Sequence, residues 1–241
     1  MSKTKVEYIG KDLESMDFAE NYHRWILELI APFLGKRIVE VGAGTGSFSR
    51  LLLETEPKEL TLIEPSAMFA GLSEFAASVN SHSRISLEND IFTNVSERLR
   101  DERPPESVVY INVLEHVPDD VAELKAVHST LADRGHICIF VPAIPFLLSD
   151  FDRKIGHFRR YRRRELITKV TEAGFKVLKV RGFDLPGILP WLVKYRLMRS
   201  TTMESGAVRL YDSVAVPVIK VLENLAPPPI GKNLIIIGEK I

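Results

Sequence analysis

The sequence has few of the groups that define the simplest protein classes. Its 241 residues include one cysteine, Cys138, so no disulfide framework can form within the chain. No C-x-x-C or H-E-x-x-H pattern occurs, and we expect no structural zinc or other bound metal. Cys138 stands in the apolar run "HICIFV", which favours a small buried side chain over a nucleophile. No apolar run approaches the roughly 20 residues that span a bilayer. The N-terminus resembles no secretion signal, and we expect a cytoplasmic protein.

The formal net charge of the chain is zero, because 32 Lys and Arg residues balance 32 Asp and Glu residues. Proteins that neutralise many phosphates usually carry a basic domain, so we expect no nucleic-acid partner. The one strongly basic stretch is "IGHFRRYRRREL" at 155–166, with five arginines, a histidine and a tyrosine. A cluster this local indicates either a binding site or a patch of surface charge.

Short apolar runs alternate with helical patterns through the first two thirds of the chain. Strands are predicted at 37–41, 59–65, 84–88, 107–113 and 136–142, and helices at 12–34, 47–55, 67–79 and 118–132. This alternation predicts an α/β fold with a parallel sheet covered on both faces. The last third predicts a helix at 163–175, strands at 176–183 and 233–241, and helices at 186–199 and 207–225 between those strands. An insertion this long is more than a plain loop.

A glycine-rich turn, "VEVGAGTGSFS" at 39–49, follows the first predicted strand. Gly42, Gly44 and Gly46 allow a sharp turn and a close approach of the backbone to a ligand. Their E-x-G-x-G-x-G spacing differs by one residue from the dinucleotide-binding form, and no Lys-Ser/Thr pair follows as in a P-loop. The pattern therefore favours a nucleoside ligand without a pyrophosphate.

Acidic residues stand at the ends of successive strands, on the ligand side of an open α/β sheet. Glu64 closes the second strand and can accept hydrogen bonds from both ribose hydroxyls. Asp90 follows the third strand, where it can accept a bond from an adenine amino group while Ile91 packs against the ring. Glu40 lies inside the first strand, and a buried acid there needs a partner such as a ligand ammonium.

These segments resemble the class I S-adenosylmethionine-dependent methyltransferases, in particular their small-molecule members. The resemblance covers roughly residues 36–145, in "VEVGAGTG", "LIEPS", "END" and "YINVLEHVPDD". It implies a Rossmann-like, seven-stranded, mostly parallel sheet with a reversed final hairpin. It also implies S-adenosylmethionine as cofactor and S-adenosylhomocysteine as product. The cofactor residues carried over are Gly42, Gly44, Gly46, Glu64, Asp90 and Asn112.

The same resemblance suggests how the chain is organised. We expect one methyltransferase domain over 1–241, with a core at 36–184 and 231–241. A helical cap would occupy 1–35, and a helical insertion or lid would occupy 185–230. The sequence does not determine the oligomeric state and leaves a homodimer open.

"GHFRRY" is similar to a segment in a subgroup of small-molecule methyltransferases, some of them associated with glycosyltransferases. In that resemblance His157, Arg160 and Tyr161 face the substrate side, with Arg160 binding an acidic or hydroxylated group. If the acceptor holds a proton, His157 and His116 are the candidate bases, since imidazole titrates near neutrality. The alternative for His116 is a structural role in the loop after strand four. Trp191, in the insertion, is a further candidate for acceptor binding.

Three functions remain open at this point. The first is methyl transfer to a small-molecule or lipid- or sugar-linked acceptor. The second is methylation of nucleic acid or protein through the basic residues 159–164. The third is an NAD-dependent oxidoreductase on the same fold, against which the glycine spacing weighs. The apolar and basic segment 185–199 is predicted to form a lid or, alternatively, to contact an anionic membrane surface.

Overall fold

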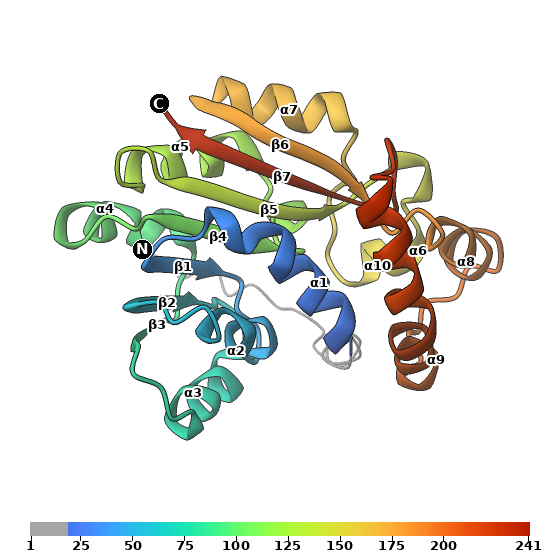
Figure 1. The fold of residues 1–241 in the computed structure, drawn as a ribbon, viewed down its shortest axis with the longest axis horizontal. Coiled ribbons are helices and arrows are strands. Elements are labelled where there is room, and N and C mark those ends of the chain that lie inside the picture. The colour runs from blue at the N-terminus through green and yellow to red at the C-terminus, as the bar shows by residue number, and fades with distance from the viewer. Residues whose placement is uncertain (1–18) are drawn as a thin grey trace.

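Seven strands form one sheet in the computed structural model, which describes residues 19–241. The strands are β1 (Arg37–Val41), β2 (Glu59–Ile63), β3 (Arg84–Glu88), β4 (Ser107–Ile111), β5 (His136–Pro142), β6 (Phe175–Phe183) and β7 (Asn233–Lys240). Their order is β3-β2-β1-β4-β5-β7-β6, and β7 runs antiparallel to both neighbours (Figure 1). This confirms the predicted Rossmann-like sheet with its reversed final hairpin.

Two strands end earlier than the sequence pattern predicted. β2 ends at Ile63 and β4 ends at Ile111, two residues short of the predicted bounds in each case. Glu64 and Asn112 therefore lie in the loops just after the strands. This position lets their side chains leave the alternation of the sheet and face the ligand side.

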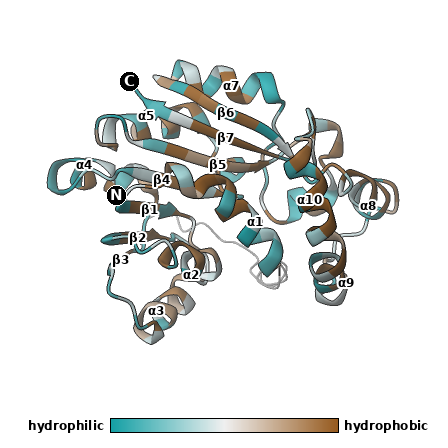
Figure 2. Ribbon diagram, viewed as in Figure 1, coloured by the Kyte–Doolittle hydropathy of each residue, from teal (hydrophilic) through white to brown (hydrophobic). Residues whose placement is uncertain are grey.

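Helices cover both faces of the sheet, as the near-continuous apolar strands require. One face packs on α1 (Glu20–Ile30), α2 (Ser47–Leu53) and α3 (Phe69–Ser78), and the other on α4 (Phe92–Glu102), α5 (Asp120–Thr130) and α7 (Arg163–Glu172). Figure 2 shows the hydrophobic residues concentrated along the inner strands. Helix α4 was not predicted from the sequence, because its few apolar positions are spread among charged residues. Of the predicted 12–34 helix and 1–35 cap, residues up to 18 lie outside the described residues.

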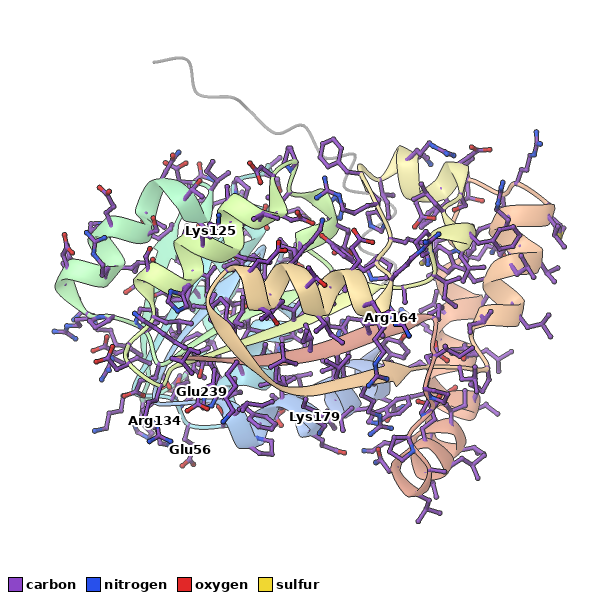
Figure 3. The ribbon with its side chains drawn as sticks, turned by 90° about the horizontal axis from the view of Figure 1, so that it is seen from above. Glu56, Lys125, Arg134, Arg164, Lys179 and Glu239 are labelled. Atoms are coloured by element: carbon purple, nitrogen blue, oxygen red, sulfur yellow. The ribbon has the colours of Figure 1, made fainter. Side chains whose placement is uncertain are left out.

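The insertion between β6 and β7 is helical, as predicted, but broken into short pieces. It contains α8 (Ile188–Trp191), the π-helical turn η6 (Leu192–Leu197), α9 (Ser205–Leu210), the π-helical turn η7 (Tyr211–Ala215) and α10 (Val216–Leu225). These helices gather at one end of the sheet beside α6 (Asp150–Lys154) (Figure 1). The opposite end carries Arg134 and Glu239, whose charged groups lie 3.4 Å apart (Figure 3). Within residues 19–241, no helix is long and apolar enough to cross a membrane.

A buried carboxylate, Asp184, joins the insertion to the core. It follows β6 and accepts hydrogen bonds from the hydroxyls of Tyr22 on α1 and Tyr211 on η7. Lys232, just before β7, pairs with it at 2.7 Å. Burial alone would raise the pKa of Asp184, but the Lys232 charge and these hydrogen bonds outweigh burial and lower it. Asp184 is therefore a charged anchor between three segments that are distant in sequence.

A second carboxylate of the insertion caps α1. The backbone N–H groups at a helix start have no partner within the helix, and α1 has no capping side chain of its own. Asp212 on η7 accepts bonds from the backbone N–H groups of Tyr22 at 2.8 Å and Asn21 at 3.0 Å. Asp212 therefore holds the first turn of α1 against the insertion.

Replacing this cap should loosen the contact between α1 and the insertion. We expect Asp212→Ala to lower the free energy of unfolding by about 1–2 kcal/mol, as for loss of a helix cap. Urea denaturation followed by circular dichroism measures this change. Ser213→Ala, at the exposed neighbouring position, is the matched control and should have little effect. Equal stabilities of the two variants would contradict the capping role of Asp212.

Candidate active site

A cavity of about 890 Å³ lies where the carboxyl ends of the parallel strands meet the insertion. Ligands bind at this edge in open α/β sheets. Its walls come from the glycine loop, the ends of β2 and β4, and helices α6, α8 and η6. Predicted residues that line it are Glu40, Gly42, Gly44, Glu64, Asp90, Ile91, Asn112, His116, His157, Arg160 and Trp191. The structure thus brings most of the predicted site residues to one cavity.

The three glycines of the loop serve different purposes. All have positive φ, at +70° for Gly42, +59° for Gly44 and +93° for Gly46. A Cβ on Gly42 would lie 2.4 Å from Val113, and one on Gly46 would lie 2.4 Å from Phe75, so both are required by packing. At Gly44 the nearest atom would be Met68 Sδ at 4.0 Å. The open cradle over Gly44 is therefore where a ligand can approach the backbone, whereas Gly46 does not line the cavity.

Glu64 and Asp90 stand on the same side of the cavity as this cradle. Glu64 is 3 % exposed, and its two oxygens accept bonds from the backbone N–H groups of Gly44 and Ser66, both at 2.9 Å. Each carboxylate oxygen has a second lone pair, so Glu64 retains acceptor capacity toward a ligand. Asp90 accepts bonds from Ile91 N–H and the Asn94 amide through Oδ1. This arrangement fits the ribose and adenine positions of S-adenosylmethionine implied by the resemblance.

Glu40 is a buried acid next to the glycine loop. It is 2 % exposed and accepts a short hydrogen bond from the Ser49 hydroxyl on α2. Burial raises the pKa of Glu40 to about 8, with the nearby Glu64 carboxylate adding to the effect and the Ser49 bond opposing it. A cationic group bound beside Glu40 would favour its ionised form. Glu40 is thus suited to the ammonium end of the cofactor.

Asp152 organises the opposite end of the cavity. It is fully buried on α6 and forms a capping box with Ser149. Its carboxylate lies 3.0 Å from His157 Nδ1 and accepts bonds from Nε and Nη2 of the Arg160 guanidinium, the shortest at 2.7 Å. Burial alone would raise the pKa of Asp152, but the bonds from His157 and Arg160 lower it to about 2. One carboxylate therefore fixes both side chains.

Three ionisable groups converge beside this network. Glu115 and His116 lie on the 3₁₀ turn η4 (Leu114–His116) after β4. His157 Nε2 lies 3.7 Å from Glu115 Oε1, and the His116 and His157 rings meet edge to face at 4.6 Å. Burial raises the pKa of Glu115 to about 7, against the opposing charge of His157. Burial lowers the pKa of His116 to about 3, so its imidazole is neutral.

The geometry places Tyr161 away from the predicted substrate side, whereas the predicted role of Arg160 stays a prediction. Tyr161 is fully buried outside the cavity, with its hydroxyl 2.8 Å from Asp120 Oδ2 and 3.1 Å from the Leu114 carbonyl oxygen. Burial and the Asp120 charge raise its pKa, so it braces the loop and does not face an acceptor. Arg160 lines the cavity but is 4 % exposed, bound to Asp152 and to the Ala143 carbonyl. Its charge is already neutralised, which argues against binding an acidic substrate group.

The remaining arginines of the basic stretch differ in their surroundings. Arg159 pairs with Asp120 at 2.8 Å and donates to the Pro118 carbonyl. Arg163 donates to the carbonyls of Val180 and Pro229. Arg162 and Arg164 are exposed at the start of α7, with Arg164 on the outside of the molecule (Figure 3). Three of the five arginines, Arg159, Arg160 and Arg163, therefore make contacts within the chain.

Trp191 closes the cavity from the insertion. The Arg160 guanidinium carbon lies 4.5 Å from the centre of its ring, and the indole N–H donates to the Leu147 carbonyl. Tyr195 and Phe151 pack beside it, with ring centres at 4.4 Å and 5.9 Å from Trp191. This aromatic wall belongs to the predicted acceptor side of the cavity.

Three further groups shape the site and were not predicted from the sequence: Asp152, Glu115 and Asp184. The S-x-x-D spacing of Ser149 and Asp152 was a readable helix-start signal that could have drawn attention to Asp152. Glu115 is adjacent to His116 in "LEH", but nothing in the sequence showed that its carboxylate is buried beside His157. Asp184 gave no local signal, because its partners lie far away in the chain.

Comparisons with known proteins bear on this site. Residues 15–180 match the family model described as a methyltransferase domain. A SAM-dependent methyltransferase of Archaeoglobus fulgidus has a similar structure, with a TM-score of 0.63 and 16 % identity over 95 % of this chain and 98 % of that one. No curated protein matched.

Two further solved structures share the fold. One is a SAM-dependent methyltransferase of Thermotoga maritima, described as a possible histamine N-methyltransferase, with a TM-score of 0.59 and 17 % identity over 97 % of this chain and 96 % of that one. The other is mycolic acid cyclopropane synthase CmaA1, with a TM-score of 0.58 and 13 % identity over 88 % of this chain and 81 % of that one. Identities this low indicate a common fold.

Glu64 should be a main determinant of cofactor affinity. Loss of charge-assisted hydrogen bonds, each contributing about 1.5–3 kcal/mol, should make Glu64→Gln bind S-adenosylmethionine roughly 10- to 100-fold more weakly. Calorimetric titration measures this affinity. Glu74→Gln, an exposed position on α3, is the control and should bind as the wild type does. Unchanged affinity in Glu64→Gln would refute the ribose assignment.

Glu40 should couple cofactor binding to proton release. Its pKa of about 8 means that it is mostly protonated near neutral pH, and a cationic ligand shifts it toward the ionised form. Binding should therefore release protons, and affinity should rise from about pH 6 to about pH 7.5 as the wild-type carboxyl ionises more readily. Calorimetry in buffers of different ionisation enthalpy measures the release. Glu40→Gln should show less release and a flatter profile, and identical behaviour of both proteins would rule this coupling out.

Proposed function

The chain belongs to the methyltransferase-domain family, and on that premise we propose that it transfers a methyl group from S-adenosylmethionine to a large, mostly apolar acceptor, such as a lipid or a lipid-linked sugar, at a membrane surface. The observation that carries this proposal is the insertion between β6 and β7. It lines the acceptor side of the cavity and also presents an apolar stripe to solvent. The oxidoreductase alternative is set aside by the family match.

The cofactor supplies an electrophilic methyl group on a sulfonium centre when it is bound. The chain then needs mainly to align the acceptor with this group and to exclude water. Glu64, Asp90 and Ile91 would hold the adenosine portion, while Glu40 and Asn112 would lie toward the amino-acid portion. The methyl group would point to the end of the cavity where His116 and His157 lie.

The acceptor end of the cavity is lined largely by apolar and aromatic side chains. Phe151, Trp191 and Tyr195 form one wall, and Met203 and Val208 come from further along the insertion. Such a lining favours an acceptor with substantial apolar surface. Polar side chains such as Arg160 and Lys194 also line the cavity. His116 and His157 stay candidates for handling a proton on the acceptor.

The outer face of the insertion carries the exposed apolar stripe. It consists of six residues, each at least 60 % exposed: Leu210, Val214, Val218, Val221, Leu222 and Leu225. Their spacing of about four residues, continued over α9, η7 and α10, places them on one side of the helix. Figure 2 shows hydrophobic residues along α9 and α10. Contiguous apolar patches of this kind mark interaction sites in soluble proteins.

The charge around this stripe favours an anionic lipid surface as its partner. Within residues 188–225 there are five basic side chains and three acidic ones. Asp212 and Glu223 are buried, which leaves Glu204 as the exposed acid of this segment, whereas Arg196, Arg199 and Arg209 are exposed. Apolar helices flanked by arginine and lysine lie in the interface of anionic membranes. A lipid acceptor could then reach the cavity without leaving the surface.

The basic residues 159–164 give less support to a nucleic-acid or protein acceptor. Arg159, Arg160 and Arg163 are held by carboxylates or carbonyls of the chain. One solved structure with a similar fold is a mycolic acid cyclopropane synthase, whose name refers to a lipid. This likeness agrees with the proposal of a lipid acceptor.

Vesicle co-sedimentation tests this proposal. The protein should pellet with vesicles containing phosphatidylglycerol and much less with vesicles of phosphatidylcholine alone. Removing two leucines in Leu210→Ser/Leu222→Ser should weaken binding at least about tenfold, because each partly buried leucine contributes up to about 1.5–3 kcal/mol. Leu178→Ser, an exposed leucine on β6, is the control and should bind normally. Absence of binding to either vesicle, or equal binding by the stripe variant, would overturn the membrane assignment.

A further inference from the structure

We propose that Glu115, His116 and His157 bind a first-row divalent transition-metal ion at the acceptor end of the cavity. One ligand atom from each residue lies within 4.8 Å of those of the other two. The site does not depend on which class of acceptor the enzyme methylates, and it differs from the sequence expectation that no metal is bound.

The spacing of the three groups suits a metal ion after a small adjustment. Nitrogen and oxygen ligands lie about 2.0–2.2 Å from such an ion, which separates neighbouring ligand atoms by roughly 3–3.5 Å. His157 Nε2 and Glu115 Oε1 are 3.7 Å apart. This is too long for a hydrogen bond but close to the separation that a shared ion would impose. A shift of the Glu115 carboxylate by a fraction of an ångström would bring this distance into the range expected for two ligands of one ion.

Glu115 provides the strongest indication of a ligand. Its side chain is 0 % exposed, and neither carboxylate oxygen has a hydrogen-bond partner within the described residues. A buried carboxylate left in this state is costly, because it has lost water without gaining other donors. The carboxylate points at the two imidazoles, so an ion between the three groups would satisfy it.

Groups around the two histidines are arranged as in metal sites. His157 Nδ1 lies 3.0 Å from Asp152 Oδ1, which leaves Nε2 directed toward Glu115. His116 is hydrogen-bonded to the Gly156 carbonyl, which fixes its ring. A carboxylate or carbonyl on the second nitrogen orients a ligating histidine and sets its tautomer. Asp152 would thus act as a positioning residue for the metal, in addition to binding Arg160.

The donor set indicates the kind of ion. Two imidazoles and one carboxylate suit Zn²⁺, Mn²⁺, Fe²⁺ or Co²⁺, whereas Mg²⁺ and Ca²⁺ prefer oxygen ligands alone. Three protein ligands leave further coordination positions open. His116 and His157 line the cavity, so those positions face the space that an acceptor occupies. An acceptor hydroxyl bound there would be held in place and would lose its proton to solvent more easily.

An arrangement without metal competes with this proposal. A doubly protonated His157 could pair with Asp152 through Nδ1 and with Glu115 through Nε2, forming a buried ion pair network. That network would stabilise the loop and would have no affinity for a metal ion. Metal binding by the folded protein separates the two explanations directly.

The experiment uses the untagged full-length protein, stripped with a chelator and titrated with Co²⁺ under visible absorption. One Co²⁺ per chain should bind, and Zn²⁺ should displace it. Glu115→Gln, which keeps the shape of the side chain, and His157→Gln should each weaken Co²⁺ binding at least about tenfold. Glu74→Gln and His82→Gln, both at exposed positions, are the matched controls and should bind Co²⁺ as the wild type does.

Two further readouts keep the test decisive. Affinity for S-adenosylmethionine should be unchanged in Glu115→Gln, which shows that the variant is folded. Pulsed EPR of Mn²⁺ bound to the wild type should show coupling to imidazole nitrogen, a result that needs no variant. The proposal is wrong if Co²⁺ fails to bind, if Glu115→Gln binds it as tightly as the wild type does, or if bound Mn²⁺ shows no nitrogen coupling.

Discussion

The buried carboxylate of Asp152 is the interaction on which the acceptor side of this protein depends. Asp152 is fully buried and accepts hydrogen bonds from the Ser149 hydroxyl and the Arg160 guanidinium. His157 Nδ1 lies 3.0 Å from the same carboxylate. A charge at this depth is stable only because these donors surround it. The fixed Arg160 guanidinium then packs on the Trp191 ring, with its carbon 4.5 Å from the ring centre. One charge in the core thereby sets the positions of the histidine, the arginine and the tryptophan that line the acceptor end.

The cavity therefore has two ends with different origins. One end is formed by the glycine loop, by Glu40 within β1 and by the acids after β2 and β3. These elements lie close together in the sheet. The other end combines η4, α6 and the insertion, which meet through long-range contacts. Asp184 and Asp212 repeat the same principle at the base of the insertion, where each carboxylate joins segments far apart in the chain. The helical insertion is thus tied to the core by buried carboxyl groups, and its outer face stays apolar.

The two ends also differ in how far the sequence could predict them. The strand pattern and the E-x-G-x-G-x-G spacing predicted the sheet and the cofactor cradle, because period and glycine placement are local properties. Local reasoning did not predict that Gly46 is required by Phe75 packing while Gly44 faces the cavity. The resemblance of "GHFRRY" to a methyltransferase subgroup placed Arg160 and Tyr161 on the substrate side. Their buried partners, Asp152 and Asp120, lie 8 and 41 residues away in sequence, and only the folded chain brings them together.

The most direct test of this account is a crystal structure of the protein with bound S-adenosylhomocysteine. The account predicts the adenosine against Glu64, Asp90 and Ile91, with the ribose hydroxyls on Glu64. It also predicts a free volume remaining between the cofactor sulfur and the side chains of His116, His157 and Trp191. An adenosine bound at the Trp191 end, or a sulfur directed away from His157, would contradict the assignment of the two ends.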